Sequence, residues 1–140
     1  MHIGTLGDLT VRNATLRANA PAIFFEGRTI THAQFAARAS RLANALLKLG
    51  VQRGDRVAIL AQNCPEYMET YAAGELGGWT TVTINFRLAA AEIGYILSDS
   101  QPKILIVEQQ FVDRLAAATP SLRNILTIGG DGPDSTTKRC

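Results

Sequence analysis

One strand–helix–strand motif decides the fold of this chain: TTVTINFRLAAAEIGYILSDSQPKILIVE, residues 80–108. The β-branched run at 80–84 predicts a strand, apolar residues at helical spacing predict a helix over about 90–99, and KILIVE at 103–108 predicts a second strand. Strands joined through a helix of this length are typical of a parallel pair, because a parallel connection has to cross back over the sheet. The motif therefore predicts an α/β fold.

The same alternation continues outward from this motif. Residues 57–61, VAILA, form a continuous apolar run, as expected for a strand that is covered on both faces. A helix is expected to start around Asn63 and Pro65, where Glu66 stands three residues after Asn63 as in a capping arrangement. The apolar face of this helix is expected to comprise Met68, Tyr71, Ala72 and Leu76. Two further elements are expected, a helix at 109–118 and a strand at 125–129. The whole pattern predicts a mostly parallel sheet flanked by helices.

The amino-terminal residues predict a short helix, a hairpin and a long helix. A helix is expected over 9–19, and AIFFEGRTIT at 22–31 predicts a hairpin with a glycine-containing turn at Glu26-Gly27. The helix at 31–50 begins with Thr31 and Gln34, the two residues of a capping box, and Gly50 is expected to close it as a left-handed cap. Its apolar face is expected to comprise Phe35, Ala39, Leu42, Leu46 and Leu49.

Composition bounds the class of protein. The 140 residues are 46% hydrophobic and 19% charged with a net charge of +2, which fits one globular domain. No cluster of basic and aromatic residues indicates a nucleic-acid partner. No apolar stretch approaches the roughly 20 residues of a membrane span, and no secretion signal is visible. Two cysteines, Cys64 and Cys140, form no disulfide framework. We therefore expect a cytoplasmic protein without a transmembrane segment.

Arg87 is the one candidate binding residue. It stands between the strand at 80–84 and the helix at 90–99, and a cation in such a place often meets a phosphate or a carboxylate. The alternatives are a pairing with a local carboxylate such as Glu92, or a solvated position in the loop. Asn85 is expected to bond to the local backbone and to shape the turn.

Other chemistry-bearing residues give weaker patterns. His2 lies at the terminus and His32 at the first residue of a helix, so neither is expected to be a catalytic base. No histidine or cysteine pair has metal-ligand spacing, and no glycine-rich dinucleotide or phosphate loop joins a strand to a helix. Cys64 is either a reactive thiol at a helix start or a small residue fitted beside Pro65. We predict no catalytic residue and no metal site.

Four stretches carry a resemblance to a known family: AIFFEGRTITHAQF at 22–35, LANALLKLGVQRGDRVAIL at 42–60, QNCPEY at 62–67 and GGWTTVTINFRLAAAEIGYILSDS at 77–100. In this order and at these intervals they resemble the start of the AMP-forming acyl-CoA synthetases, the adenylate-forming or AMP-binding enzyme superfamily. The resemblance covers roughly residues 9–110 and favours the CoA-ligating branch.

Two departures from the family pattern stand out. In the family, the helix after the N-x-R-L loop commonly opens with Thr or Ser, whereas this chain has Ala89. Loss of the N-cap side chain is expected to cost about 1 kcal/mol of stability. Glu92 partly offsets this cost because its charge complements the helix dipole. The phosphate loop of the form Y-T-S-G-T-T-G-x-P-K-G does not occur in the 140 residues. Nor do the acidic ribose ligand, the magnesium ligand or the small domain with the catalytic lysine. The resemblance therefore implies a partial N-terminal subdomain at 1–128. The composition of residues 129–140, rich in Gly, Pro, Ser and Thr without an apolar period, predicts a flexible tail.

The resemblance implies an ATP-dependent ligase that activates a fatty or aryl carboxylic acid as acyl-AMP and transfers it to CoA. Full-length members use ATP, Mg²⁺ and CoA, none of which is expected to bind this chain tightly. The implied partners are the remainder of the synthetase chain, the acid and CoA. In CoA-ligating members the arginine of the N-x-R segment can meet a CoA phosphate, which makes Arg87 a CoA contact here.

Two alternatives remain open at this point. One is a non-catalytic, truncated interaction module, in which exposed apolar side chains drive self-association. The other is an unrelated nucleotide-binding α/β domain, against which the missing glycine-rich fingerprint already counts. In the favoured interpretation the chain is a scaffold without turnover of its own.

Overall fold

The computed structural model describes residues 4–115 and 124–129, which form two compact units. Each unit is described by itself below. The first consists of Met1–Arg53 and Pro65–Trp79, and the second consists of Gly54–Cys64 and Thr80–Cys140. The architecture is α/β, as the alternation of strands and helices predicted.

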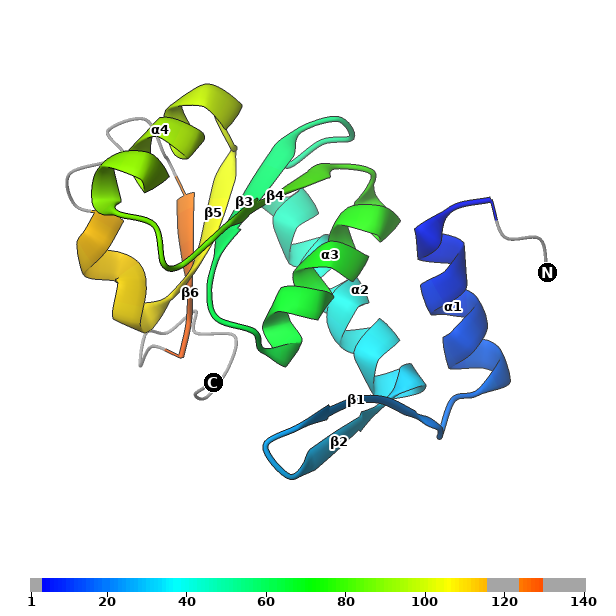
Figure 1. Cartoon of the computed structure of the whole chain (residues 1–140). Helices are drawn as coiled ribbons and strands as arrows, with labels where there is room; N and C mark the ends of the chain where they lie inside the picture. The colour runs from blue at the N-terminus through cyan, green and yellow to red at the C-terminus, as the bar shows by residue number, and fades with distance from the viewer. Residues whose placement is uncertain (1–3, 116–123, 130–140) are drawn as a thin grey trace. The chain divides into compact units, whose positions relative to one another are not determined.

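Three helices and a hairpin make up the first unit: α1 (Leu6–Leu16), β1 (Pro21–Phe25), β2 (Arg28–Thr31), α2 (His32–Lys48) and α3 (Pro65–Gly77). The three helices pack pairwise against one another, and β1 pairs with β2 in antiparallel register (Figure 1). Helix α1 begins three residues earlier than predicted, because Thr5 and Asp8 form a capping box there.

The predicted ends of α2 are confirmed. The Gln34 N–H donates to Thr31 Oγ1 at 3.3 Å, and the Thr31 N–H donates to Gln34 Oε1 at 2.9 Å. Gly50 has φ +87°, the left-handed conformation that glycine adopts without strain. Leu46 is fully buried, but the prediction that Leu49 shares its buried face is wrong. Leu49 lies at the C-cap, after the last helical turn, and is exposed.

The predicted apolar face of α3 is wrong in part. Met68 and Tyr71 are exposed, whereas Ala72 is buried as predicted and Leu76 is half-buried. Glu69 is buried instead, because its carboxylate accepts a hydrogen bond from Arg38 of α2. An ion pair between two helices thus orients α3 in a way that helical periodicity could not indicate.

A four-stranded sheet and two helices make up the second unit: β3 (Arg56–Leu60), β4 (Thr80–Ile84), α4 (Ala90–Ser100), β5 (Ile104–Glu108), η1 (Gln109–Leu115) and β6 (Asn124–Ile128). The strand order is β4-β3-β5-β6. Every pairing in this sheet is parallel, which confirms the predicted mostly parallel sheet. The helix predicted at 109–118 is a 3₁₀ helix as far as Leu115, and residues 116–118 lie outside the described residues.

One face of this sheet is covered by α4 and η1 (Figure 1). The residues that share this cluster come from β3, β4 and β5 and from both helices, and all are buried: Ala58, Leu60, Ile84, Leu105, Val107, Ile93, Leu97, Phe111 and Leu115. A large apolar side chain buried in this way contributes about 1.5–3 kcal/mol. The cluster therefore fixes η1, at the end of β5, on the same face as α4.

The carboxyl terminus is described only in part. Strand β6 ends at Ile128, one residue before the predicted end of the strand, and residues 130–140 of the predicted tail lie outside the described residues. The division into a subdomain at 1–128 and a flexible tail at 129–140 stays a prediction. Within the described part of the chain, no helix is long and apolar enough to cross a membrane.

Candidate functional site at the carboxyl edge of the sheet

The parallel sheet brings the ends of β4 and β5 to one edge. A turn at Asn85–Leu88 follows β4, and η1 follows β5 directly. In open α/β sheets, ligands bind at the carboxyl ends of the strands, because the connecting loops gather there. The residues of this edge are therefore the first place to look for a binding site.

Asn85 shapes the turn, as predicted. Its Oδ1 accepts a hydrogen bond from the Arg87 N–H at 3.0 Å. Its carbonyl oxygen accepts a second hydrogen bond from the Leu88 N–H at 3.1 Å. The two bonds close a tight turn at the end of β4, of the kind that asparagine favours.

Glu92 is held by the start of α4. Ala89 occupies the N-cap position, where its methyl side chain can accept no hydrogen bond, and Glu92 Oε2 accepts from the Ala89 N–H at 2.8 Å. One half of a capping box is thus present without the other. The carboxylate lies over the first helical turn, and the ion pair with Arg87 that we considered is not among those of the described residues.

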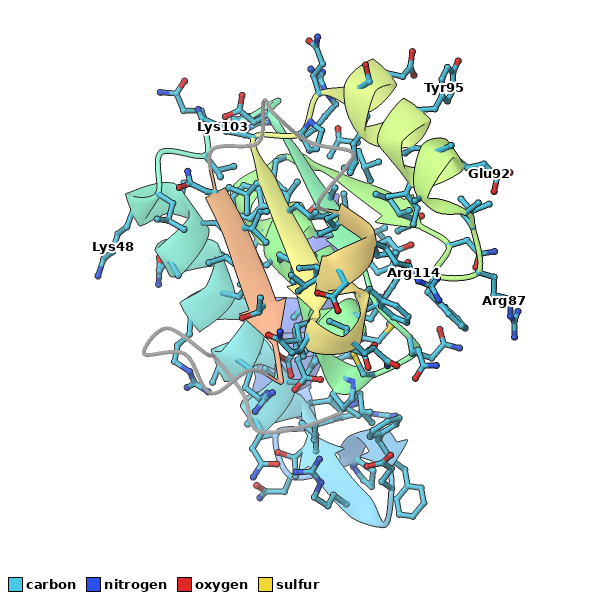
Figure 2. All side chains as sticks on the ribbon, turned by 90° about the vertical axis from the view of Figure 1, so that its left-hand side faces the viewer. Lys48, Arg87, Glu92, Tyr95, Lys103 and Arg114 are labelled. Atoms are coloured by element: carbon cyan, nitrogen blue, oxygen red, sulfur yellow. The ribbon has the colours of Figure 1, made fainter. Side chains whose placement is uncertain are left out.

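Arg87 is exposed, and its guanidinium carbon lies 5.1 Å from the centroid of the Phe86 ring. Figure 2 shows the side chain pointing away from the ribbon. Among the described residues, no carboxylate or carbonyl oxygen accepts a hydrogen bond from this guanidinium. The guanidinium is exposed to solvent and makes a cation–π contact with the Phe86 ring.

A second arginine reaches the same turn from η1. Arg114 Nη1 donates to the carbonyl oxygen of Phe86 at 2.7 Å, and its guanidinium carbon lies 5.2 Å from the Phe111 ring centroid. The Phe86 and Phe111 rings are themselves stacked, with centroids 5.7 Å apart. We call these four side chains, Arg87, Phe86, Phe111 and Arg114, the arginine–phenylalanine stack. Sequence reasoning missed Arg114, since only the 3₁₀ geometry of η1 and the fold bring it to β4.

The buried carboxylate of Glu108 lies at the end of β5, next to the end of β3. The strand order reverses at β3, which makes this gap the usual ligand crevice of a parallel sheet. Glu108, 7% exposed, accepts from the Gln62 N–H at 2.8 Å and from Gln110 Nε2. Glu108 thus links the residues that follow β3 to η1, and Arg87 remains the candidate for an external anion.

Cys64 and His32 are the remaining candidates within the described residues. Cys64 is buried just before the first residue of α3, which favours the structural interpretation over a reactive thiol. His32 is half-buried at the first residue of α2, where its backbone N–H donates to Ala20. His2 and Cys140 lie outside the described residues. Throughout the described ranges, no three His, Cys, Asp or Glu side chains are grouped so that they could hold a metal ion.

Comparison with known proteins gives consistent matches. The model of the AMP-binding enzyme family matches residues 11–138. The chain is 39% identical to a feruloyl-CoA synthase of Amycolatopsis over 80% of its length and 23% of that protein. It is 36% identical to the fatty acid–acyl-carrier-protein ligase ScoC of Streptomyces coeruleorubidus, over 89% of this chain and 24% of ScoC. A crystal structure of a candidate long-chain-fatty-acid CoA ligase from Rhodopseudomonas palustris superposes with a TM-score of 0.88 at 40% identity, covering 96% of this chain and 35% of that one. The chain thus spans about a quarter of the two curated relatives.

Proposed function

This chain belongs to the AMP-binding enzyme family, and we propose that it forms the N-terminal portion of an ATP-dependent acid–CoA ligase. In the proposed reaction, ATP and a carboxylic acid give an acyl adenylate and pyrophosphate, and the thiol of CoA then displaces AMP. The two units supply scaffold, and the carboxyl edge of the sheet supplies a contact for CoA. The groups that perform the chemistry belong to the remainder of the ligase chain.

The family match over residues 11–138 is the observation that carries this proposal. It rules out the alternative of an unrelated nucleotide-binding domain. The described residues offer no cluster of carboxylates for Mg²⁺, so no step of adenylate formation is assigned to them. The exposed guanidinium of Arg87 does fit a phosphate group of CoA, because it is a permanent cation with a fork of donors.

The relatives bear on the two substrates in different ways. Their names point to an aryl acid in one case and a fatty acid in the other. We therefore propose a fatty or aryl acid without choosing between them. CoA is the proposed acceptor, because Arg87 offers a cation where the family's N-x-R segment would meet a phosphate. An acyl-carrier protein is the second candidate acceptor, and the likeness to ScoC favours it.

Removing Arg87 is expected to weaken the binding of CoA about fivefold, because one exposed charge contact contributes on the order of 1 kcal/mol. The ¹⁵N-labelled chain can be titrated with CoA to millimolar concentrations while amide and arginine side-chain resonances are followed by NMR. Wild-type shifts are expected to cluster at Asn85–Leu88, and Arg87→Ala is expected to reduce the affinity.

Arg56→Ala is the matched control for this experiment. Arg56 is also an exposed arginine of the second unit, and its Nε donates to the carbonyl oxygen of Ser100. It lies at the first residue of β3, so it belongs to the amino edge of the parallel sheet. The control therefore removes the same charge from the same unit at the opposite edge of the sheet. Equal CoA affinities for wild type, Arg87→Ala and Arg56→Ala would count against the proposed contact.

A further inference from the structure

We propose that Arg114 is a positioning residue for the Arg87 site: it fixes the peptide unit that carries Arg87, so that the guanidinium is held ready for a phosphate. This inference rests on the proposed function, since it takes the CoA phosphate as the ligand of Arg87. It concerns a residue on a different element, 28 positions further along the chain from Phe86.

The first support is that both ends of one peptide unit are held. The carbonyl of Phe86 and the N–H of Arg87 belong to the same planar group. The carbonyl oxygen accepts from Arg114 Nη1 at 2.7 Å, and the N–H donates to Asn85 Oδ1 at 3.0 Å. A bond from a charged donor is stronger than one from a neutral donor. With both of its polar groups engaged, this plane cannot rotate without breaking one of the bonds.

The second support is that the arginine–phenylalanine stack anchors the same turn to the core. Phe111 is buried, and Phe86 stacks on it with an angle of 24° between the ring planes. Each ring also carries a guanidinium at little more than 5 Å, Arg87 on Phe86 and Arg114 on Phe111. The position of the Arg87 head group is thus tied to a buried side chain of η1 through one intervening ring.

The third support is that the Arg114 guanidinium donates a hydrogen bond within the protein, whereas among the described residues that of Arg87 donates none. Arg114 donates to the Phe86 carbonyl oxygen and lies over the Phe111 ring. Figure 2 shows the Arg87 side chain pointing away from the ribbon. The turn itself already has its closing bonds from Asn85, so the bond from Arg114 adds restraint chiefly to the peptide of Arg87.

The test compares three alanine variants in the 140-residue chain: Arg114→Ala, Arg87→Ala and the double variant. Two quantities are measured by NMR, the position of the Arg87 Nε–Hε resonance without ligand and the affinity for CoA. Arg114→Ala is expected to move the Arg87 resonance toward its position in the unfolded chain, because the Phe86 ring no longer lies under the guanidinium. It is expected to weaken CoA binding by about two- to fivefold.

The double variant separates positioning from direct contact. If Arg114 acts through Arg87, its removal costs no further affinity in the Arg87→Ala background, because the two effects are not additive. Arg56→Ala is expected to leave both measured quantities at their wild-type values. An unchanged Arg87 resonance in Arg114→Ala would overturn the inference. So would an equal loss of CoA affinity whether or not Arg87 is present.

Failure of the proposed function has a different signature. In that case the wild-type chain shows no CoA-dependent shifts at Asn85–Leu88 at all. The inference on Arg114 fails when the wild-type chain binds CoA and Arg114→Ala binds it equally well.

Discussion

Replacing Arg38 with methionine is expected to lower the free energy of unfolding by about 3 kcal/mol at pH 7. Arg38 of α2 donates to Glu69 through Nε, and to Glu66 through Nη2 at 3.2 Å, both on α3. The Glu69 side chain is only 7% exposed. Without Arg38, the Glu69 carboxylate would stay charged at a poorly hydrated position with this partner lost. Removing one partner of a buried ion pair is strongly destabilising for this reason. Methionine keeps much of the apolar part of the arginine side chain. The loss of unfolding free energy is therefore expected to come from the missing charge rather than from lost packing.

The loss is expected to shrink in acid. Burial raises the pKa of Glu69, and the hydrogen bond from Arg38 only partly opposes this. Because the folded-state pKa lies above the unfolded one, Glu69 favours folding most below its unfolded pKa, and this contribution is lost as the pH rises through the folded-state value. Removing Arg38 raises that pKa further. The variant should therefore regain stability relative to wild type as the pH falls from 7 toward the unfolded pKa of Glu69.

Urea unfolding followed by tryptophan fluorescence measures this effect, since Trp79 belongs to the same unit as Arg38. Arg41→Met is the matched control, because Arg41 is an exposed arginine of α2 whose attraction to Glu69 is the smallest influence on that carboxyl's pKa. It is expected to cost less than about 0.5 kcal/mol. Replacing Arg38 and Glu69 together by methionine should recover most of the loss. A loss below 1 kcal/mol for Arg38→Met at pH 7, with no dependence on pH, would contradict the buried ion pair.

Gly77→Ala is expected to cost about 2 kcal/mol, although alanine favours a helix over glycine by up to about 1 kcal/mol. A methyl group at Gly77, the last residue of α3, would overlap three carbons of the Trp79 ring. Trp79 is 6% exposed, so its ring has little room to move aside. In the described part of the chain its indole N–H has no hydrogen-bond partner, which leaves packing to hold the ring. The clash therefore outweighs the gain in helix propensity.

Fluorescence reports this change directly, because Trp79 is the only tryptophan of the chain. Gly77→Ala is expected to shift its emission to longer wavelength as the ring becomes exposed. Gly4→Ala serves as the control, since a methyl group there would meet only Asp8 Oδ2, at an ordinary 3.7 Å. The control should keep both emission and stability. Wild-type emission together with wild-type stability in Gly77→Ala would show that the ring does not pack on Gly77.

The parts of the fold that were predictable depend on residues close together in sequence. The capping box of Thr31 and Gln34, and the left-handed Gly50, set the ends of α2 through contacts within one helical turn. Strand β4 follows from a β-branched run of five residues, and the parallel order follows from the helices between strands. The Asn85 turn likewise needs only its neighbours.

The parts that failed depend on partners far away in the chain. The buried face of α3 is set by Arg38, which stands 31 residues before Glu69. Arg114 lies 28 residues beyond the carbonyl that it holds, on an element whose 3₁₀ geometry periodicity did not reveal. Glu108 was predicted only as the last residue of a strand. Its carboxylate accepts a hydrogen bond from the Gln62 N–H, 46 residues earlier in the chain. Arg87 was singled out by its place between a strand and a helix, and the family resemblance then implied CoA as its ligand; that role stays a prediction.

The purified 140-residue chain is expected to release no pyrophosphate above background when it is incubated with ATP, Mg²⁺ and either ferulate or a long-chain fatty acid. The reason is that the chain spans about a quarter of the two curated relatives, and we propose that the groups that perform the chemistry belong to the remainder of the ligase chain. Full-length feruloyl-CoA synthase of Amycolatopsis serves as the positive control. Release of pyrophosphate that depends on the acid and exceeds background would contradict the assignment of these residues to scaffold and CoA approach.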